Sequence, residues 1–173
     1  HCVSNYIYDK VGKLIKKYHT RNPFDILEQM NVVVKESSNY HNLKGYCLVS
    51  CKTTYVVINS QLSEPEKRIV AAHELGHVVL HRSLMKLAPM MDSTIYDMIS
   101  KTEYEANLFA ADLLLSDTDI EEMSQNEDMD YFQLCQNLYV SPELVSFKLF
   151  SLTKRGHVYN MPLNLNSKFL GTK

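Results

Sequence analysis

The chain has 173 residues, of which 45% are hydrophobic and 22% are charged. This length and balance are typical of one globular domain, with or without a small appendage, and they exclude disorder as the main state. The formal net charge of −2 excludes the strong basic excess of many nucleic-acid-binding proteins, and no apolar run approaches the ~20 residues of a membrane span.

Residues 4–19 carry apolar side chains at three- and four-residue steps, which predicts a helix. Its lysines, at positions 10, 13, 16 and 17, are expected to form a solvated face. Pro23 lies near the first turn of a second short helix that reaches Met30. Three apolar runs then predict short strands at 32–34, 45–49 and 54–58, with residues 50–53 as a hairpin connection.

A long helix is expected from Ser63 to about His81, because Ser63 and Glu66 have capping-box spacing and Pro65 falls in the first turn. Residues 83–100 are less regular and are expected to form a loop over the site. Further helices are predicted at 102–115, 117–124, 129–138 and 142–152. The fold class is α+β, with a core at 1–116 and a helical C-terminal segment at 117–173 that packs on the core without forming an independent domain.

Four cysteines are scattered along the chain, at positions 2, 47, 51 and 135. A chain of this size does not need disulfides to stabilise its core, so we expect reduced thiols in a cytoplasmic protein. No signal-peptide pattern opens the sequence. The spacing of Cys47 and Cys51 is only a weak indication of a metal site.

The strongest motif is an HExxH sequence at residues 73–77, inside the long predicted helix. Four residues advance a helix by about 400° and about 6 Å, so His73 and His77 project from one face, one turn apart. Both imidazoles can then reach one Zn²⁺ ion. Apolar residues flank the motif on both sides, and buried ionisable groups without partners are costly, which favours a metal over a chance match.

Zinc in such sites lowers the pKa of a bound water to about 7 and polarises a substrate carbonyl. Glu74 lies next to His73 and can reach the water rather than the metal. We therefore predict that Glu74 is the general base, which takes a proton from the attacking water and returns it to the leaving amine. The sequence predicts one zinc ion per chain and a metallopeptidase activity.

The third metal ligand must come from elsewhere in the chain. His81 is ~12 Å along a continuous helix from His73, too far to share its metal, and is expected to be a helix-end residue. The apolar helix at 102–115 offers Glu103 and Glu105, which are about 200° apart around the helix, so only one can face the metal. Glu103 is preferred because Asn107 lies one turn further on the same face and could orient a ligand histidine.

These segments resemble the ImmA/IrrE family of zincin metallopeptidases, through HELGHVVLH at 73–81 and EYEANLFAADLLLS at 103–116. The family's second motif runs E-x-(E or Q)-A-(N or D)-x-F-A-x-x-L-L, and its first Glu maps onto Glu103. Since the second position also accepts Gln, the resemblance supports Glu103 over Glu105. It covers roughly residues 30–150, and it implies a zincin core whose small sheet has an edge strand packed on the HExxH helix.

The resemblance also implies a substrate class, namely helix-turn-helix repressors of phages or mobile elements, whose cleavage de-represses an operon. Residues 133–145 have helix-turn-helix spacing themselves, but few basic residues lie nearby, so packing or partner docking is favoured over direct DNA binding. The strand at Tyr55–Ile58 is predicted to be an edge that binds an extended substrate. The competing function is a zinc-bearing regulator that controls a repressor or toxin–antitoxin partner by binding alone. Tyr96, Tyr104 and His81 stay open as candidates for the electrophile that stabilises the transition state.

Overall fold

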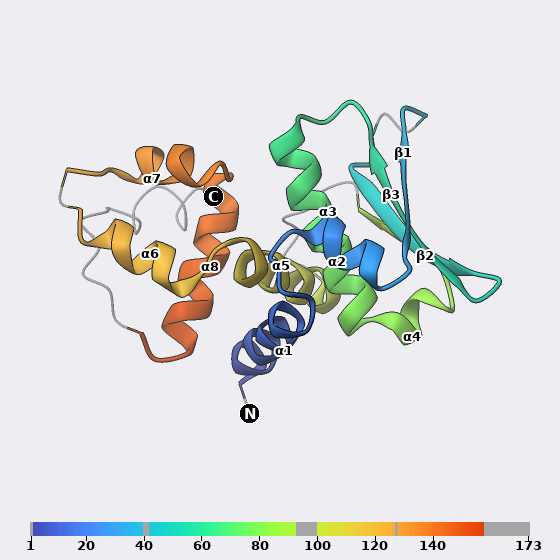
Figure 1. Ribbon diagram of the computed structural model, residues 1–173, viewed down its shortest axis with the longest axis horizontal. Coiled ribbons are helices and arrows are strands. Elements are labelled where there is room, and N and C mark those ends of the chain that lie inside the picture. Colours follow the sequence, from blue (N-terminus) through green and yellow to red (C-terminus); the bar gives the residue numbers. More distant parts are fainter. Residues whose placement is uncertain (1, 40–41, 93–99, 127, 158–173) are drawn as a thin grey trace.

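A computed structural model of the chain describes residues 2–39, 42–92, 100–126 and 128–157. These residues form an α+β fold in which helices predominate (Figure 1). The helices are α1 (Val3–Tyr18), α2 (Pro23–Gln29), α3 (Glu64–Leu80), α4 (Arg82–Met85), α5 (Lys101–Leu114), α6 (Asp117–Ser124), α7 (Tyr131–Leu138) and α8 (Pro142–Lys154). The strands are β1 (Val33–Ser37), β2 (Gly45–Ser50), β3 (Thr53–Asn59) and β4 (Met90–Asp92). No described helix is long and apolar enough to cross a membrane.

The strands form one mixed four-stranded sheet in the order β1-β3-β2-β4. β1 runs parallel to β3, whereas β2 is antiparallel to both β3 and β4. The hairpin between β2 and β3 forms as predicted, and its turn residues Cys51 and Lys52 both have positive φ angles, as a tight two-residue turn requires. The small sheet expected from the sequence is therefore present, with one strand more than the three predicted.

Two details of the predicted sheet are wrong. Tyr55–Ile58 is not an edge, because β3 lies between β1 and β2 and pairs with both. Part of the expected loop at 83–100 is regular, because it contains most of α4 and all of β4, whose Met91 pairs with Tyr46. Residues 93–99 lie outside the described part, so the expected lid is not tested there. β4 was missed because three residues are too few for an alternating pattern, and its pairing with β2 is a tertiary interaction.

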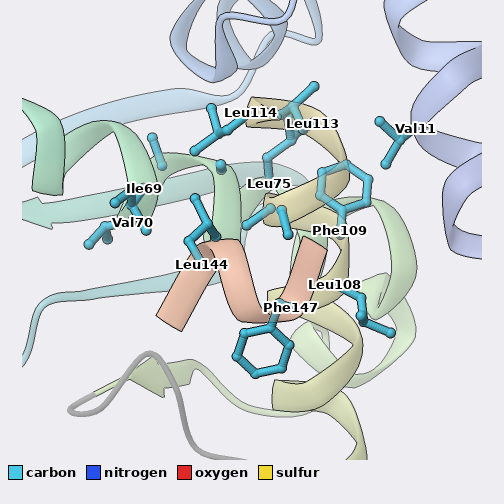
Figure 2. Packing of buried hydrophobic residues seen from close by; sticks show 14 of the residues in the cluster. Val11, Ile69, Val70, Leu75, Leu108, Phe109, Leu113, Leu114, Leu144 and Phe147 are labelled. Atoms are coloured by element: carbon cyan, nitrogen blue, oxygen red, sulfur yellow. The ribbon is translucent and has the colours of Figure 1, made fainter. Parts of the chain in front are cut away.

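Helix α3 is the centre of the fold, with the sheet on one side and α5 on another (Figure 1). Its ten residues from Ile69 to Val78 are all buried. Figure 2 shows how Leu75 of α3 lies close to Phe109 of α5 in this core. A Cβ atom on Gly76 would lie 3.2 Å from the Cα of Ala106 and 3.2 Å from Phe109, so glycine allows the two helices to approach closely.

The C-terminal helices lie on the far side of α5 from the sheet (Figure 1), and α8 packs against α5 and α1. The connection at Tyr139 links α7 and α8 as in a helix-turn-helix. However, α8 buries six of its residues, including Leu144, Phe147 and Lys148, against the rest of the protein. These residues hold one side of α8 on the core. A recognition helix is also packed on one side, so the packing role of the segment stays a prediction.

A buried charge network joins α8 to the helices around it. The Lys148 ammonium lies 3.0 Å from Asp112 of α5 and 2.7 Å from Asp117 of α6. Arg155, just after α8, forms a two-pronged pair with Asp117 and stacks 3.6 Å over the centre of the Tyr8 ring. Burial alone would raise the pKa of Asp117, but hydrogen bonds from Arg155 and Lys148 hold it well below the usual carboxyl value.

Replacing Lys148 with Met is expected to lower the free energy of unfolding by about 3 kcal/mol, because it leaves the Asp112 carboxylate buried without its main charge partner. Urea unfolding would measure the loss. Lys154→Met, on the exposed side of α8, is the matched control and should change little. Combining Lys148→Met with Asp112→Asn should recover much of the stability. If Lys148→Met were as stable as Lys154→Met, the charge network would not contribute to the stability of the fold.

Candidate metal centre

Helix α3 presents the first half of the site. Its N-terminus is capped by the Ser63 hydroxyl, which accepts a hydrogen bond from the Glu66 N–H at 3.3 Å, as the sequence predicts. The helix then continues without interruption through residues 73–77, and the side chains of His73, Glu74 and His77 are completely buried. The two imidazole rings stack edge to face with their centroids 4.8 Å apart, so they project together from one face of the helix.

Helix α5 brings the third candidate ligand to the two histidines. One carboxylate oxygen of Glu103 lies 3.0 Å from His73 Nε2, and the other lies 3.1 Å from His77 Nε2. The three ligand atoms all lie within 4.8 Å of one another. Glu105 is not part of this group. Zinc sites with two histidines and one carboxylate have this composition, so the three residues could hold a single ion.

The hydrogen bond of His73 indicates which of its nitrogens is available to a metal. Its Nδ1 lies 2.8 Å from the Asn107 side-chain oxygen, which can only accept, so Nδ1 carries the proton. In the neutral ring Nε2 then has a lone pair, and it points at a Glu103 oxygen that also has only lone pairs to offer. Two acceptors 3.0 Å apart require a cation between them, either a proton or a metal ion. The donor set and its tautomer therefore fit a divalent metal.

His81, which ends α3, lies behind His77 rather than in open solvent. The Nδ1 atoms of His77 and His81 are 2.9 Å apart, and His81 Nε2 lies 3.4 Å from a Glu105 oxygen. Burial, followed by the neighbouring His77, lowers the pKa of His81, so this ring is neutral near neutral pH. The sequence interpretation of His81 as a helix-end residue missed this contact, although the four-residue spacing from His77 was a usable signal.

Glu74 lies between the metal candidates and the sheet. A Cβ atom on Gly45 of β2 would be 3.4 Å from Glu74 Oε1, 3.1 Å from the Val57 carbonyl oxygen and only 2.6 Å from Val70 Cγ1. Glycine at this position lets the β2 backbone approach α3 closely beside the Glu74 carboxylate. Glu74 therefore lies beside Gly45 of β2, and Gly45 pairs with Asp92 of β4. The candidate site is thus close to β4, the last strand in the sheet order.

The structure describes the surroundings of two of the three residues considered as electrophiles for the transition state, Tyr104 and His81. The Tyr104 ring packs against Phe147 and Phe150, so it faces α8 and not the histidines. His81 is directed at His77 and Glu105. Tyr96 lies outside the described residues. The structure therefore favours neither Tyr104 nor His81 for direct contact with a substrate.

Comparisons with known proteins agree with this geometry. A sequence model described as the IrrE N-terminal-like domain, a peptidase family, matches residues 27–150, which include α3 and α5. The chain belongs to the ImmA/IrrE family of metallopeptidases. It is 36% identical over 117 residues to an uncharacterized immunity region protein 2 of Bacillus phage phi105. This alignment covers 68% of this chain and 73% of the relative. The chain is 28% identical over 127 residues to the metallopeptidase ImmA of Bacillus subtilis strain 168, covering 73% and 70% respectively.

Membership of this family makes the chain a metallopeptidase of the ImmA type, and the fold class expected from the sequence is confirmed. The matched region contains all the residues that form the candidate metal centre. It also contains His81 and Glu105, the two side chains behind His77. The family assignment and the local geometry thus agree on the same pair of helices.

Proposed function

We propose that this protein is a zinc-dependent endopeptidase with His73, His77 and Glu103 as metal ligands and Glu74 as general base. The observation that carries the proposal is the convergence of two buried imidazoles and one partly buried carboxylate within 4.8 Å, next to a buried glutamate. Two nitrogens and one oxygen are a donor set that zinc prefers, and three protein ligands leave a coordination position open, as a catalytic site needs.

The residues divide the chemistry among them. A zinc ion at this centre would make a water more acidic and polarise the scissile carbonyl. Glu74 would accept the proton of the attacking water and return it to the leaving amine, which is general acid–base catalysis by one carboxylate. Asn107 holds His73 in the tautomer that presents Nε2. Residues in α3 and α5 therefore hold the site, and the sheet beside Glu74 would position the substrate.

The substrate is expected to be a helix-turn-helix repressor of a phage or mobile element, cleaved so that its operon is de-repressed. Support comes from the relative in a phage immunity region and from the relative named ImmA. Repressors act on DNA inside the cell, so we keep the cytoplasmic location as a prediction. An extended substrate segment would pair with the outer side of β4, which has one neighbour among the described strands, rather than with β3, which has two.

The C-terminal segment 117–173, which is helical in its described part, is proposed to belong to the same folding unit and not to an independent domain. The buried pairs of Lys148 with Asp112 and Asp117 support this, because they join α8 to α5 and α6. The non-catalytic alternative, a zinc-bearing regulator that acts by binding a repressor or a toxin–antitoxin partner, uses the same metal ligands. It gives no reason for a buried glutamate at position 74.

The proposal is tested by incubating the zinc-loaded protein with a purified helix-turn-helix repressor from a phage immunity region and following the products by mass spectrometry. Cleavage at one peptide bond is expected. A strong zinc chelator should stop the reaction, and added zinc should restore it. A repressor that stays intact with metal-loaded protein, but is bound by it, would contradict the peptidase proposal and favour the regulator.

A further inference from the structure

Helix α5 supports both histidines of the candidate metal centre, but by two different routes. Asn107 contacts His73 directly, with its side-chain oxygen 2.8 Å from Nδ1. Glu105 lies on another side of the helix and is connected to His77 through His81. The route from Glu105 to His77 contains one more side chain than the contact between Asn107 and His73, so its effect on His77 has to be worked out separately.

The hydrogen bond between His77 and His81 has two possible directions. It joins two Nδ1 atoms 2.9 Å apart, so one ring must donate and the other must accept. If His77 donates, its Nε2 keeps the lone pair that a metal needs, 3.1 Å from Glu103. If His81 donates, the proton of His77 moves to Nε2 and points at the position of the metal. Only the first direction is compatible with metal binding.

Glu105 selects that first direction. When His77 donates, His81 accepts at Nδ1 and carries its own proton on Nε2, which faces the Glu105 carboxylate at 3.4 Å. When His81 donates instead, its Nε2 lone pair faces a negatively charged acceptor, which is unfavourable. The His81 ring is only 6% exposed and the Glu105 side chain only 15%, so water weakens this preference little.

We propose that Glu105 and His81 are positioning residues that hold His77 in the tautomer and the ring orientation that a bound metal needs. Carboxylates that hold a ligand histidine in this way raise its basicity and fix its orientation, and their loss weakens metal binding about 10- to 100-fold. The inference rests on the proposed function, since it concerns how this chain prepares its metal site. It concerns affinity for the metal, and neither residue contacts the substrate.

The test measures zinc dissociation constants by competition with a chromophoric chelator, at one fixed pH, for purified full-length variants. His81→Phe removes both ring nitrogens and is expected to weaken zinc binding about 10- to 100-fold. Glu105→Ala is expected to weaken it about 10-fold. Glu122→Gln, an exposed change on α6, is the matched control and should bind as the unmodified protein does. Circular dichroism and a thermal midpoint in the absence of metal confirm that each variant is folded.

A rescue variant separates tautomer control from a general effect of charge or packing. His81→Asn can place an acceptor oxygen near the position of Nδ1, which imitates the contact between Asn107 and His73 and no longer needs Glu105. It should recover much of the affinity lost in His81→Phe. Glu105→Ala should then have little further effect when combined with His81→Asn. The absorption spectrum of bound Co²⁺ should change in His81→Phe and return towards the original in His81→Asn.

Two results would overturn the inference while leaving the metal site intact. One is zinc affinity and a Co²⁺ spectrum in His81→Phe equal to those of the unmodified protein. The other is an effect of Glu105→Ala that is the same with His81 and with Asn at that position, because this would indicate a charge acting through space. If the unmodified protein binds no stoichiometric zinc, the proposed function is wrong and the inference fails with it.

Discussion

Replacing Glu74 with Gln is expected to leave zinc bound and to lower the rate of repressor cleavage about 100- to 10,000-fold. The amide has nearly the same shape as the carboxylate, so it fits the buried position beside Gly45. It cannot accept the proton of the attacking water, which is the contribution that a general base makes. Because Glu74 is not among the candidate ligands, the metal content should stay the same.

The measurement is a time course of cleavage with zinc content determined on the same samples. Glu64→Gln, an exposed change in the first turn of α3, is the control and should retain full activity. A second readout is de-repression of a reporter operon in cells. If Glu74→Gln de-represses the reporter as well as the unmodified protein, the chain acts by binding, and the non-catalytic alternative replaces the peptidase.

Helix α3 was predictable because its signals are local. Ser63 caps the first turn, Pro65 fits there, and the apolar residues on either side of the HExxH motif require burial. The preference for Glu103 depended on Asn107 at the next turn of the same face and on the family resemblance. The structure places Glu103 beside the two histidines and Asn107 beside His73. That Glu103 is the third metal ligand stays a prediction.

The details that the sequence did not predict depend on contacts between distant segments. The position of β3 inside the sheet follows from its pairing with β1, and β4 is held by β2 more than 40 residues earlier in the sequence. The contacts of His81 depend on the side-chain rotamers of His77, of Glu105 and of His81 itself. Periodicity reports which face of a helix is buried, but it does not report which buried polar groups meet.

The choice between Glu103 and Glu105 has a direct chemical test, which is the metal content of single variants. Glu103→Ala and His77→Ala are each expected to reduce bound zinc from one ion per chain to almost none after dialysis, because two remaining ligands rarely hold zinc in competition with buffer. Glu105→Ala should retain most of its one ion after the same dialysis, with only the affinity weakened, since its carboxylate contacts His81 and not the ligand cluster.

Elemental mass spectrometry on dialysed protein would measure these contents, and the thermal midpoint of each variant serves as the folding control. The expected order follows from geometry alone, because Glu103 is 3.0 and 3.1 Å from the two ligand nitrogens, whereas Glu105 is separated from His77 by a whole imidazole ring. Loss of zinc in Glu105→Ala with retention in Glu103→Ala would reverse the assignment of the third ligand. It would also require α5 to rotate on binding metal, because both carboxylates cannot face the two histidines from one helix at the same time.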